Sequence, residues 1–188
     1  MTAIPEESDP PSAIVIDHGS FSVKCGFGGE EAPSTNLLAL HPDFPHETDH
    51  VTYSGNYRFV EEGASLIPEG YSKCSVINEG VVQNWDCLEA LWEKFLVETE
   101  VDCSEKPIIV MSAMSNNCAT STSKFCELAF EKFGFDKLCI STPEPMALLG
   151  TGRFTGVVTN IGYDYCVSRP IVNALNSFKK DLESRFIG

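Results

Sequence analysis

The sequence has few basic residues, no long apolar run and no clustered metal ligands. Its 13 basic residues are set against 27 acidic ones, and the formal net charge of −14 argues against unaided binding to nucleic acid or an anionic membrane surface. No apolar run approaches the length of roughly 18 residues that a transmembrane helix requires, so we expect no membrane partner. Residues 1–12 are acidic and proline-rich, unlike a signal or transit peptide, and we interpret them as a flexible tail. These features favour a cytoplasmic protein, with a nuclear location as the alternative.

The cysteines and histidines do not form a recognisable metal motif. No Cys-x-x-Cys pair occurs among the eight cysteines. Without a secretory signal we expect free thiols that serve as small core residues. His41, His46 and His50 lie in one segment without helical spacing, and we interpret them as loop histidines rather than ligands. We therefore expect no metal site.

The apolar pattern predicts strands that alternate with helices. Short apolar runs predict strands at 13–16, 22–27, 107–111 and 138–140, and a hairpin at 156–159 and 165–168. Apolar residues at helical spacing predict helices at 86–96, 125–133 and 173–186, and Pro143 is placed to begin another that ends near Gly150. Residues 30–50 are expected to form a long irregular excursion. The order predicts an α/β domain whose sheet is at least partly parallel.

Three collinear segments carry a resemblance to the actin superfamily, and specifically to actin-related proteins. Residues 17–20 (Asp-His-Gly-Ser) with 24–33 (Lys-Cys-Gly-Phe-Gly-Gly-Glu-Glu-Ala-Pro) resemble the opening motif of that family. Residues 78–86 resemble the segment that enters its first long helix, and 152–158 (Gly-Arg-Phe-Thr-Gly-Val-Val) resemble the stretch that leads to its second phosphate loop.

The resemblance implies an RNase H-like, actin-type ATPase domain corresponding to the first half of an actin, with a mixed sheet flanked by helices. It covers residues 13–172, within which 34–77 take the place of a reduced and divergent second subdomain. Residues 173–188 depart from the family pattern and are expected to form an amphipathic C-terminal helix.

The resemblance also places a nucleotide site. Asp17 matches the carboxylate near the metal, Gly19 and Ser20 match phosphate-loop donors, and Lys24 matches the lysine that faces phosphate. These four residues are the expected nucleotide-binding set if binding is retained. Phe21, however, stands where the family has a glycine that allows close approach of the phosphates.

Positions that the resemblance links to hydrolysis are replaced. Pro143 stands in place of the glutamine that orients water, and Asn160 in place of the aspartate of the second loop. Tyr163 replaces an acidic residue, Asp164 a glycine and Val167 a histidine. We therefore expect a pseudo-ATPase with no catalytic residues and no cofactor, with ATP and magnesium as the alternative.

The expected terminal helix has two interpretations. Leu175, Phe178, Leu182 and Phe186 would form an apolar stripe, which either covers the sheet as a lid or binds a partner. We favour the lid, because the half-length sheet would otherwise expose a large apolar patch.

The sequence thus predicts a non-catalytic, actin-like structural subunit of a cytoskeletal or other assembly, which acts by docking to protein partners. Those partners include actin or actin-related proteins, and the resemblance implies settings such as dynactin, the axoneme or chromatin-remodelling complexes. A nucleotide-binding ATPase or filament-forming protein is the alternative.

Overall fold

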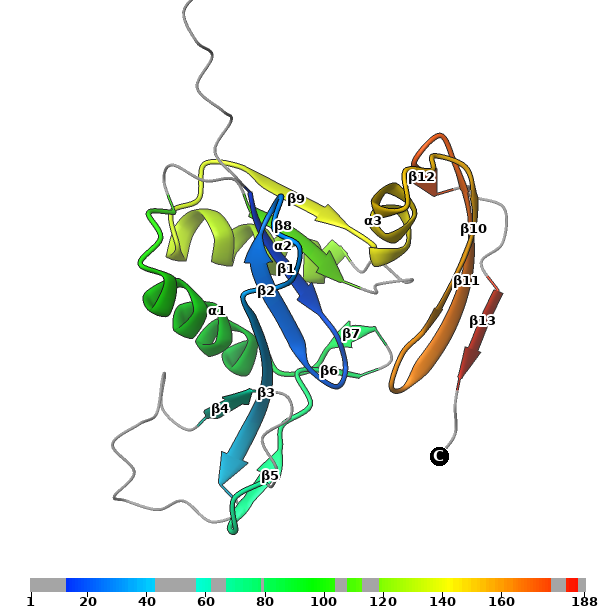
Figure 1. Ribbon diagram of the computed structural model, residues 1–188. Helices are drawn as coiled ribbons and strands as arrows, with labels where there is room; N and C mark the ends of the chain where they lie inside the picture. Colours follow the sequence, from blue (N-terminus) through cyan, green and yellow to red (C-terminus); the bar gives the residue numbers. More distant parts are fainter. Residues whose placement is uncertain are drawn as a thin grey trace, which may run out of the picture.

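The computed structural model describes residues 13–42, 57–61, 67–78, 80–103, 108–112, 119–176 and 182–185, and its centre is a mixed sheet (Figure 1). The strands of this sheet are β1 (Ile14–His18), β2 (Val23–Phe27), β3 (Thr35–Pro42), β4 (Arg58–Glu61), β5 (Tyr71–Lys73), β8 (Ile108–Ser112) and β9 (Leu138–Ser141). Their order is β4-β3-β2-β1-β8-β9, and β5 also pairs with β3. β1 is antiparallel to β2 and parallel to β8, which is parallel to β9. The predicted mixed α/β architecture is confirmed.

Helix α1 (Trp85–Thr99) supplies much of the core beneath this sheet. Its apolar residues recur three and four positions apart, so one face of the helix is buried, including Leu88, Leu91, Trp92 and Phe95. A second helix, α2 (Ala119–Cys126), continues directly into a π-helical segment η1 (Glu127–Lys132). Phe125 of α2 is fully buried against Trp92, with 6.1 Å between ring centroids.

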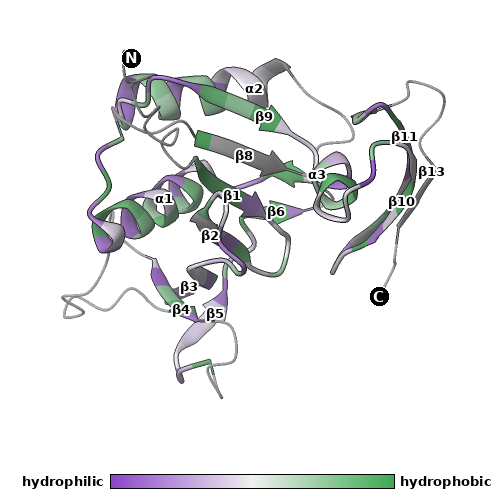
Figure 2. Cartoon of the chain, turned by 45° about the horizontal axis from the view of Figure 1, so that its top comes forward, coloured by the Kyte–Doolittle hydropathy of each residue, from purple (hydrophilic) through white to green (hydrophobic). Residues whose placement is uncertain are grey.

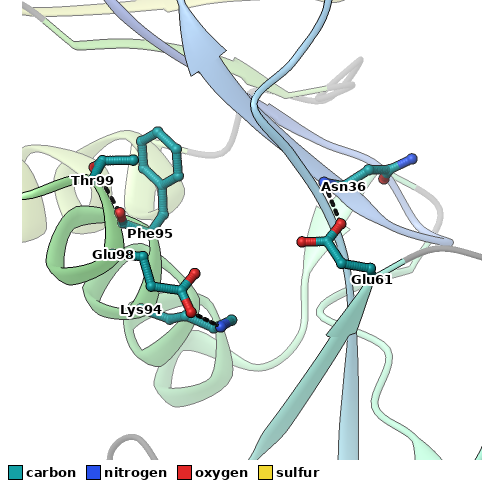
Figure 3. A network of polar contacts seen from close by, with 6 residues as sticks. All are labelled: Asn36, Glu61, Lys94, Phe95, Glu98 and Thr99. Carbon is teal, nitrogen blue, oxygen red and sulfur yellow. Dashed lines mark hydrogen bonds and ion pairs between the residues drawn. The ribbon is translucent and has the colours of Figure 1, made fainter. Parts of the chain in front are cut away.

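Both ends of α1 are closed by local hydrogen bonds. At the start, the side chain of Asn84 accepts a hydrogen bond from the backbone N–H of Cys87. At the end, the Thr99 hydroxyl donates to the carbonyl of Phe95 over 2.7 Å (Figure 3). The next residue, Glu100, takes a left-handed backbone conformation. Figure 3 also shows the Asn36 N–H donating to the Glu61 carboxylate, which ties β3 to β4.

A smaller sheet lies apart from the large one, with helix α3 (Pro143–Gly150) between them (Figures 1 and 2). It consists of β10 (Gly156–Ile161), β11 (Tyr165–Val172), β12 (Leu175–Asn176) and β13 (Leu182–Arg185). β11 pairs antiparallel with the other three. The predicted hairpin is thereby confirmed, as is the helix that begins at Pro143. Strands β6 (Ile77–Asn78) and β7 (Val81–Val82) form a separate antiparallel two-stranded ribbon.

The predicted amphipathic helix over 173–186 is wrong. Leu175 lies in strand β12 and Leu182 in strand β13, while Phe178 and Phe186 lie outside the described residues. Asn173 and Ala174 have φ values of 53° and 61°, which an α-helix cannot accommodate, and they form the two-residue turn that joins Val172 to its partner Leu175. Strands β12 and β13 instead form backbone pairs with the edge of β11 that β10 does not occupy.

The expectation of an irregular excursion over 30–50 also needs correction. Residues 35–42 form β3, which pairs with β2, β4 and β5 and buries Leu37 and Leu40. The alternation of apolar residues is too weak here to predict a strand from the sequence. Pairing with neighbouring strands on both edges nevertheless stabilises one. Residues 43–50, including His46 and His50, lie outside the described part of the chain. Among the described helices, none combines the length and apolar character needed to span a bilayer.

Candidate functional site

The turn after β1 and the turn after β10 face each other across a cavity of about 360 Å³. The first wall comes from residues 17–24, the second from residues 158–163. The first turn of α3 closes the cavity from a third side with Pro143, Glu144 and Ala147. The four residues predicted to bind nucleotide, Asp17, Gly19, Ser20 and Lys24, all line this cavity. The structure thus brings these four residues together, while their binding of nucleotide stays a prediction.

Asp17 and Lys24 are directly opposite each other on the antiparallel strands β1 and β2. Asp17 is half-buried and Lys24 is exposed. Burial raises the pKa of the Asp17 carboxyl above its ordinary value of 3.8; the positive charge of Lys24 opposes this shift and the negative charge of Glu144 adds to it. The pair therefore combines a carboxyl group whose pKa is raised with an exposed ammonium group.

The turn after β1 requires glycine at position 19 for steric reasons. A Cβ atom there would lie 2.7 Å from the carbonyl oxygen of Ser22, and the same oxygen accepts a hydrogen bond from the Gly19 N–H. Next to it, the Ser20 hydroxyl donates to Oδ1 of Asp164 over 2.6 Å and so links the two turns. The hydroxyl predicted as a phosphate donor is thus bound to the opposite turn.

Two aromatic rings meet beside that hydrogen bond. Phe21 from the first turn and Tyr163 from the second have centroids 5.2 Å apart and an interplanar angle of 45°. The ammonium group of Lys73, at the end of β5, lies 4.0 Å from the Phe21 centroid and 4.3 Å from the Tyr163 centroid. We call these three side chains the Phe21–Lys73–Tyr163 stack.

A buried ion pair lies behind the wall of the cavity, to which Glu144 contributes. Glu144 in α3 accepts a hydrogen bond from Nη1 of Arg169 in β11 over 2.8 Å, and their side chains are 0% and 3% exposed. The other carboxylate oxygen of Glu144 accepts from Nδ2 of Asn160 over 3.1 Å. Each carboxylate oxygen of Glu144 therefore accepts a hydrogen bond, and the side-chain amide of Asn160 points toward Glu144.

The register of the small sheet explains why these groups converge. Asn160 is opposite Val167, and Val158 is opposite Arg169, so all four lie on the face of the β10–β11 ribbon that is turned toward α3. Val167 is fully buried there. On the other face, Val157 and Ile161 are each 71% exposed.

Sequence reasoning missed Glu144, Arg169 and Lys73. A signal existed for Arg169, because it interrupts the buried alternation of Val167 and Ile171 in β11. Nothing in the sequence pairs it with Glu144, and nothing marks Lys73. Within the described residues no group of three or more histidine, cysteine or acidic side chains is arranged to hold a metal ion.

The mixed sheet and the two facing hairpin turns define an actin-type, RNase H-like α/β domain. Comparison with known proteins agrees, since residues 8–184 match the actin family (described as "Actin"). The chain therefore belongs to the actin family.

Its relatives include centractin from Saccharomyces cerevisiae, which is 29% identical over 160 residues, or 84% of this chain and 41% of centractin. Actin-like protein 9 from Homo sapiens is 26% identical over 170 residues, and that from Mus musculus 27%; each match covers 89% of this chain and 40% of the relative. The chain thus spans about two fifths of the length of these relatives.

Proposed function

We propose that this chain is a non-catalytic member of the actin family that acts as a structural subunit of a cytoskeletal or other multiprotein assembly. The observation that carries the proposal is the bonding of Asn160 to Glu144 and of Glu144 to Arg169. Metal-assisted hydrolysis needs carboxylates that hold a metal and its water, together with a group that orients the attacking water. Glu144 is enclosed and neutralised by Arg169, and Asn160 offers a neutral amide that is already donating.

The neighbouring residues support the same proposal. Pro143 begins α3 without a side-chain donor or acceptor, so it cannot orient a water molecule. Val167 is apolar and buried beside Asn160. The Phe21 and Tyr163 rings occupy the turns where backbone N–H groups would approach a phosphate chain. The residues present therefore do not fit magnesium and ATP in the manner that hydrolysis requires.

Docking to other proteins is supported by the outer face of the β10–β11 ribbon. Val157 and Ile161 project from it, and Phe154 at its end is 63% exposed. β10 is also an edge strand of the small sheet, which can accept a partner's strand or apolar side chains. Kinship with centractin and actin-like protein 9 supports partners among cytoskeletal proteins, actin or actin-related proteins among them, and a cytoplasmic location with a nuclear one as the alternative.

The docking role is tested by cross-linking in cell extract followed by mass spectrometry. We expect Val157→Thr/Ile161→Thr to lose specific partners at least tenfold. Val97→Thr is the matched control, because Val97 on α1 is 59% exposed and lies away from the ribbon. Equal loss in the control, or full retention in the double variant, would refute this docking face.

Nucleotide binding without hydrolysis is the second candidate, and the cross-strand pair of Asp17 and Lys24 favours it. Purified protein would be incubated with magnesium-ATP, passed through gel filtration and analysed for nucleotide. The structural-subunit proposal predicts far less than one nucleotide per chain. Stoichiometric nucleotide that Lys24→Ala removes would establish the second candidate instead.

A further inference from the structure

Two cysteines, Cys74 and Cys87, lie side by side in the core near the start of α1. Cys74 directly follows β5, and Cys87 is in the first turn of α1. Both belong to the same buried cluster, and a hydrogen bond joins their thiol groups. Neither residue lines the cavity between the two turns, so what this pair does is independent of the proposed function.

The backbone already holds the two thiol-bearing segments together. The N–H groups of Gln83 and Asn84 both donate to the carbonyl of Val76, over 2.9 Å and 3.4 Å. In addition, the N–H of Cys74 donates to the carbonyl of Ala39 in β3 over 2.8 Å. The segment after β5 is therefore fixed between β3 and the start of α1, and a bond between the two sulfur atoms needs little movement of the chain.

The side chain of Asn84 contacts both cysteines. Its Oδ1 atom accepts from the N–H of Cys87 over 2.9 Å, and its Nδ2 atom donates to Sγ of Cys74 over 3.5 Å. A donor aimed at a sulfur atom stabilises the thiolate, which is the form that attacks an oxidant. Cys74 is also the more accessible of the two, at 8% exposed against 0% for Cys87. Cys74 is therefore better placed than Cys87 to be the attacking sulfur.

The pKa values of the two thiols are shifted in opposite directions, which agrees with this division of roles. The hydrogen bond with Cys87 lowers the pKa of Cys74 below its ordinary value of 9.0, although burial opposes the shift. His41 and the Asn84 amide lower it further. The same hydrogen bond, together with burial, raises the pKa of Cys87. Cys74 therefore ionises first, and Cys87 keeps its proton.

We propose that Cys74 and Cys87 are a redox-active dithiol, which a hydroperoxide converts into an intrachain disulfide. The disulfide closes a loop that contains the β6–β7 ribbon, and it links the segment after β5 covalently to α1. Oxidation would thus tie the β3–β5 part of the large sheet to the helix that packs beneath that sheet. A reducing agent reverses the link, as in other redox-responsive cysteine pairs.

The reaction proceeds in two steps. The Cys74 thiolate attacks one peroxide oxygen, the O–O bond breaks, and the departing oxygen leaves as water or an alcohol with the proton that Cys74 had released. Cys74 is then a sulfenic acid. The sulfur of Cys87 attacks the sulfur of Cys74, the S–O bond breaks, and the hydroxyl leaves as water with the Cys87 proton. The two thiols lose two electrons in total, and the peroxide is reduced by them.

The test treats the purified, reduced full chain with hydrogen peroxide, alkylates the remaining thiols under denaturing conditions and maps the peptides by mass spectrometry. We expect the oxidised chain to carry two alkyl groups fewer than the reduced chain, together with a cross-linked peptide pair that contains Cys74 and Cys87. Dithiothreitol should restore both thiols. Cys139→Ala is the matched control, because Cys139 is an exposed cysteine outside the buried cluster, and this variant should form the cross-link as the wild type does.

Two further variants separate the roles of the thiols. Cys87→Ala should stop at the sulfenic acid of Cys74, which dimedone traps, whereas Cys74→Ala should leave Cys87 reduced. A wild type that keeps both thiols, a bond from either one to a different cysteine, a cross-linked dimer on a non-reducing gel, or oxidation of Cys87 in Cys74→Ala would overturn the proposal. Should a variant fail to fold, as judged by circular dichroism, the peptide map of the wild type decides alone, because it identifies both sulfur atoms.

Discussion

At the scale of single residues, Glu144 is an acidic side chain in a buried position. It is fully enclosed, and its charge is balanced by Arg169 on a different element. Removing one partner of a buried ion pair leaves the other charge buried without that partner, which costs far more than the pair itself contributes. Glu144 therefore links α3 to β11 through a contact that neither element can replace.

We predict that Glu144→Ala lowers the free energy of unfolding by about 3–5 kcal/mol, as measured by urea denaturation. Glu98→Ala is the control, because Glu98 pairs with Lys94 on the surface of α1 and its loss should cost about 0.5 kcal/mol or less. Glu144→Leu/Arg169→Met should recover much of the loss, since no buried charge then remains unpaired. Equal losses at positions 144 and 98 would contradict this assignment.

Asp17 makes stability depend on pH. Its pKa is raised in the folded chain, so the folded chain retains a proton that the unfolded chain releases. The stabilising contribution is complete below the unfolded value of 3.8 and is lost as pH rises through the raised folded value.

Asp17→Asn cannot ionise, so we expect its unfolding free energy to rise relative to the wild type as pH increases from about 4 to about 8. Urea denaturation at a series of pH values measures the difference. Lys24→Met should move the transition further upward, because Lys24 lowers the pKa of Asp17. A difference that stays flat or falls with pH would show that Asp17 is not held in a desolvated position.

At the scale of elements, the turn between β11 and β12 shows how local backbone geometry decides structure. Asn173 and Ala174 both have positive φ, as in the two-residue turns that suit antiparallel hairpins. Asparagine tolerates this conformation, whereas alanine is strained by its Cβ atom. The turn is therefore formed at a cost that glycine would not incur.

We predict that Ala174→Gly raises the free energy of unfolding by about 0.5–1 kcal/mol. Ala147→Gly in α3 should have the opposite sign and a similar size, because Ala147 has helical backbone. Thermal unfolding of the three proteins provides the comparison. A loss of stability in Ala174→Gly would mean that the backbone there is not left-handed.

The start of α1 depends on Asn84, which does more than cap the helix. The side-chain oxygen Oδ1 of Asn84 accepts hydrogen bonds from the Cys87 N–H and from the Tyr57 hydroxyl. The side-chain nitrogen Nδ2 donates to the sulfur of Cys74. We predict that Asn84→Ala lowers stability by about 1–2 kcal/mol. Asn84→Asp keeps the capping oxygen and should lose less, as thermal unfolding will show. Identical losses in the two variants would argue that the cap itself contributes nothing.

These elements also mark what the sequence could predict. Strands β1, β2, β8 and β9 and helix α1 were accessible because continuous or periodic apolar residues leave few alternatives, although the helix predicted at 86–96 is shorter than the observed Trp85–Thr99. The 3-4-4 spacing from Leu175 to Phe186 is typical of a helix, yet the Asn173–Ala174 turn is a weak signal without glycine. Asp17, Ser20 and Lys24 were found through a contiguous motif, whereas the Glu144–Arg169 pair arises only from packing between distant elements.

At the scale of the whole molecule, two sheets are joined through one short helix and one pair of turns. Along the chain, α3 follows β9, the last strand of the large sheet, and leads into the small sheet. The turn between β10 and β11 then contacts the turn after β1. This closure brings Lys73, Phe21 and Tyr163 together and places Glu144 against Arg169. The same path therefore lines the cavity between the turns with side chains, such as Ser20, Glu144 and Asn160, that are hydrogen-bonded to other residues of the chain.

The most direct test of the non-catalytic proposal is phosphate release from magnesium-ATP by the purified chain under single-turnover conditions, with protein in excess over nucleotide. We predict release at the rate of buffer alone, unchanged by Lys24→Ala. Release faster than buffer in the wild type and abolished by Lys24→Ala would contradict the account, because it would show that the cavity between the two turns hydrolyses ATP.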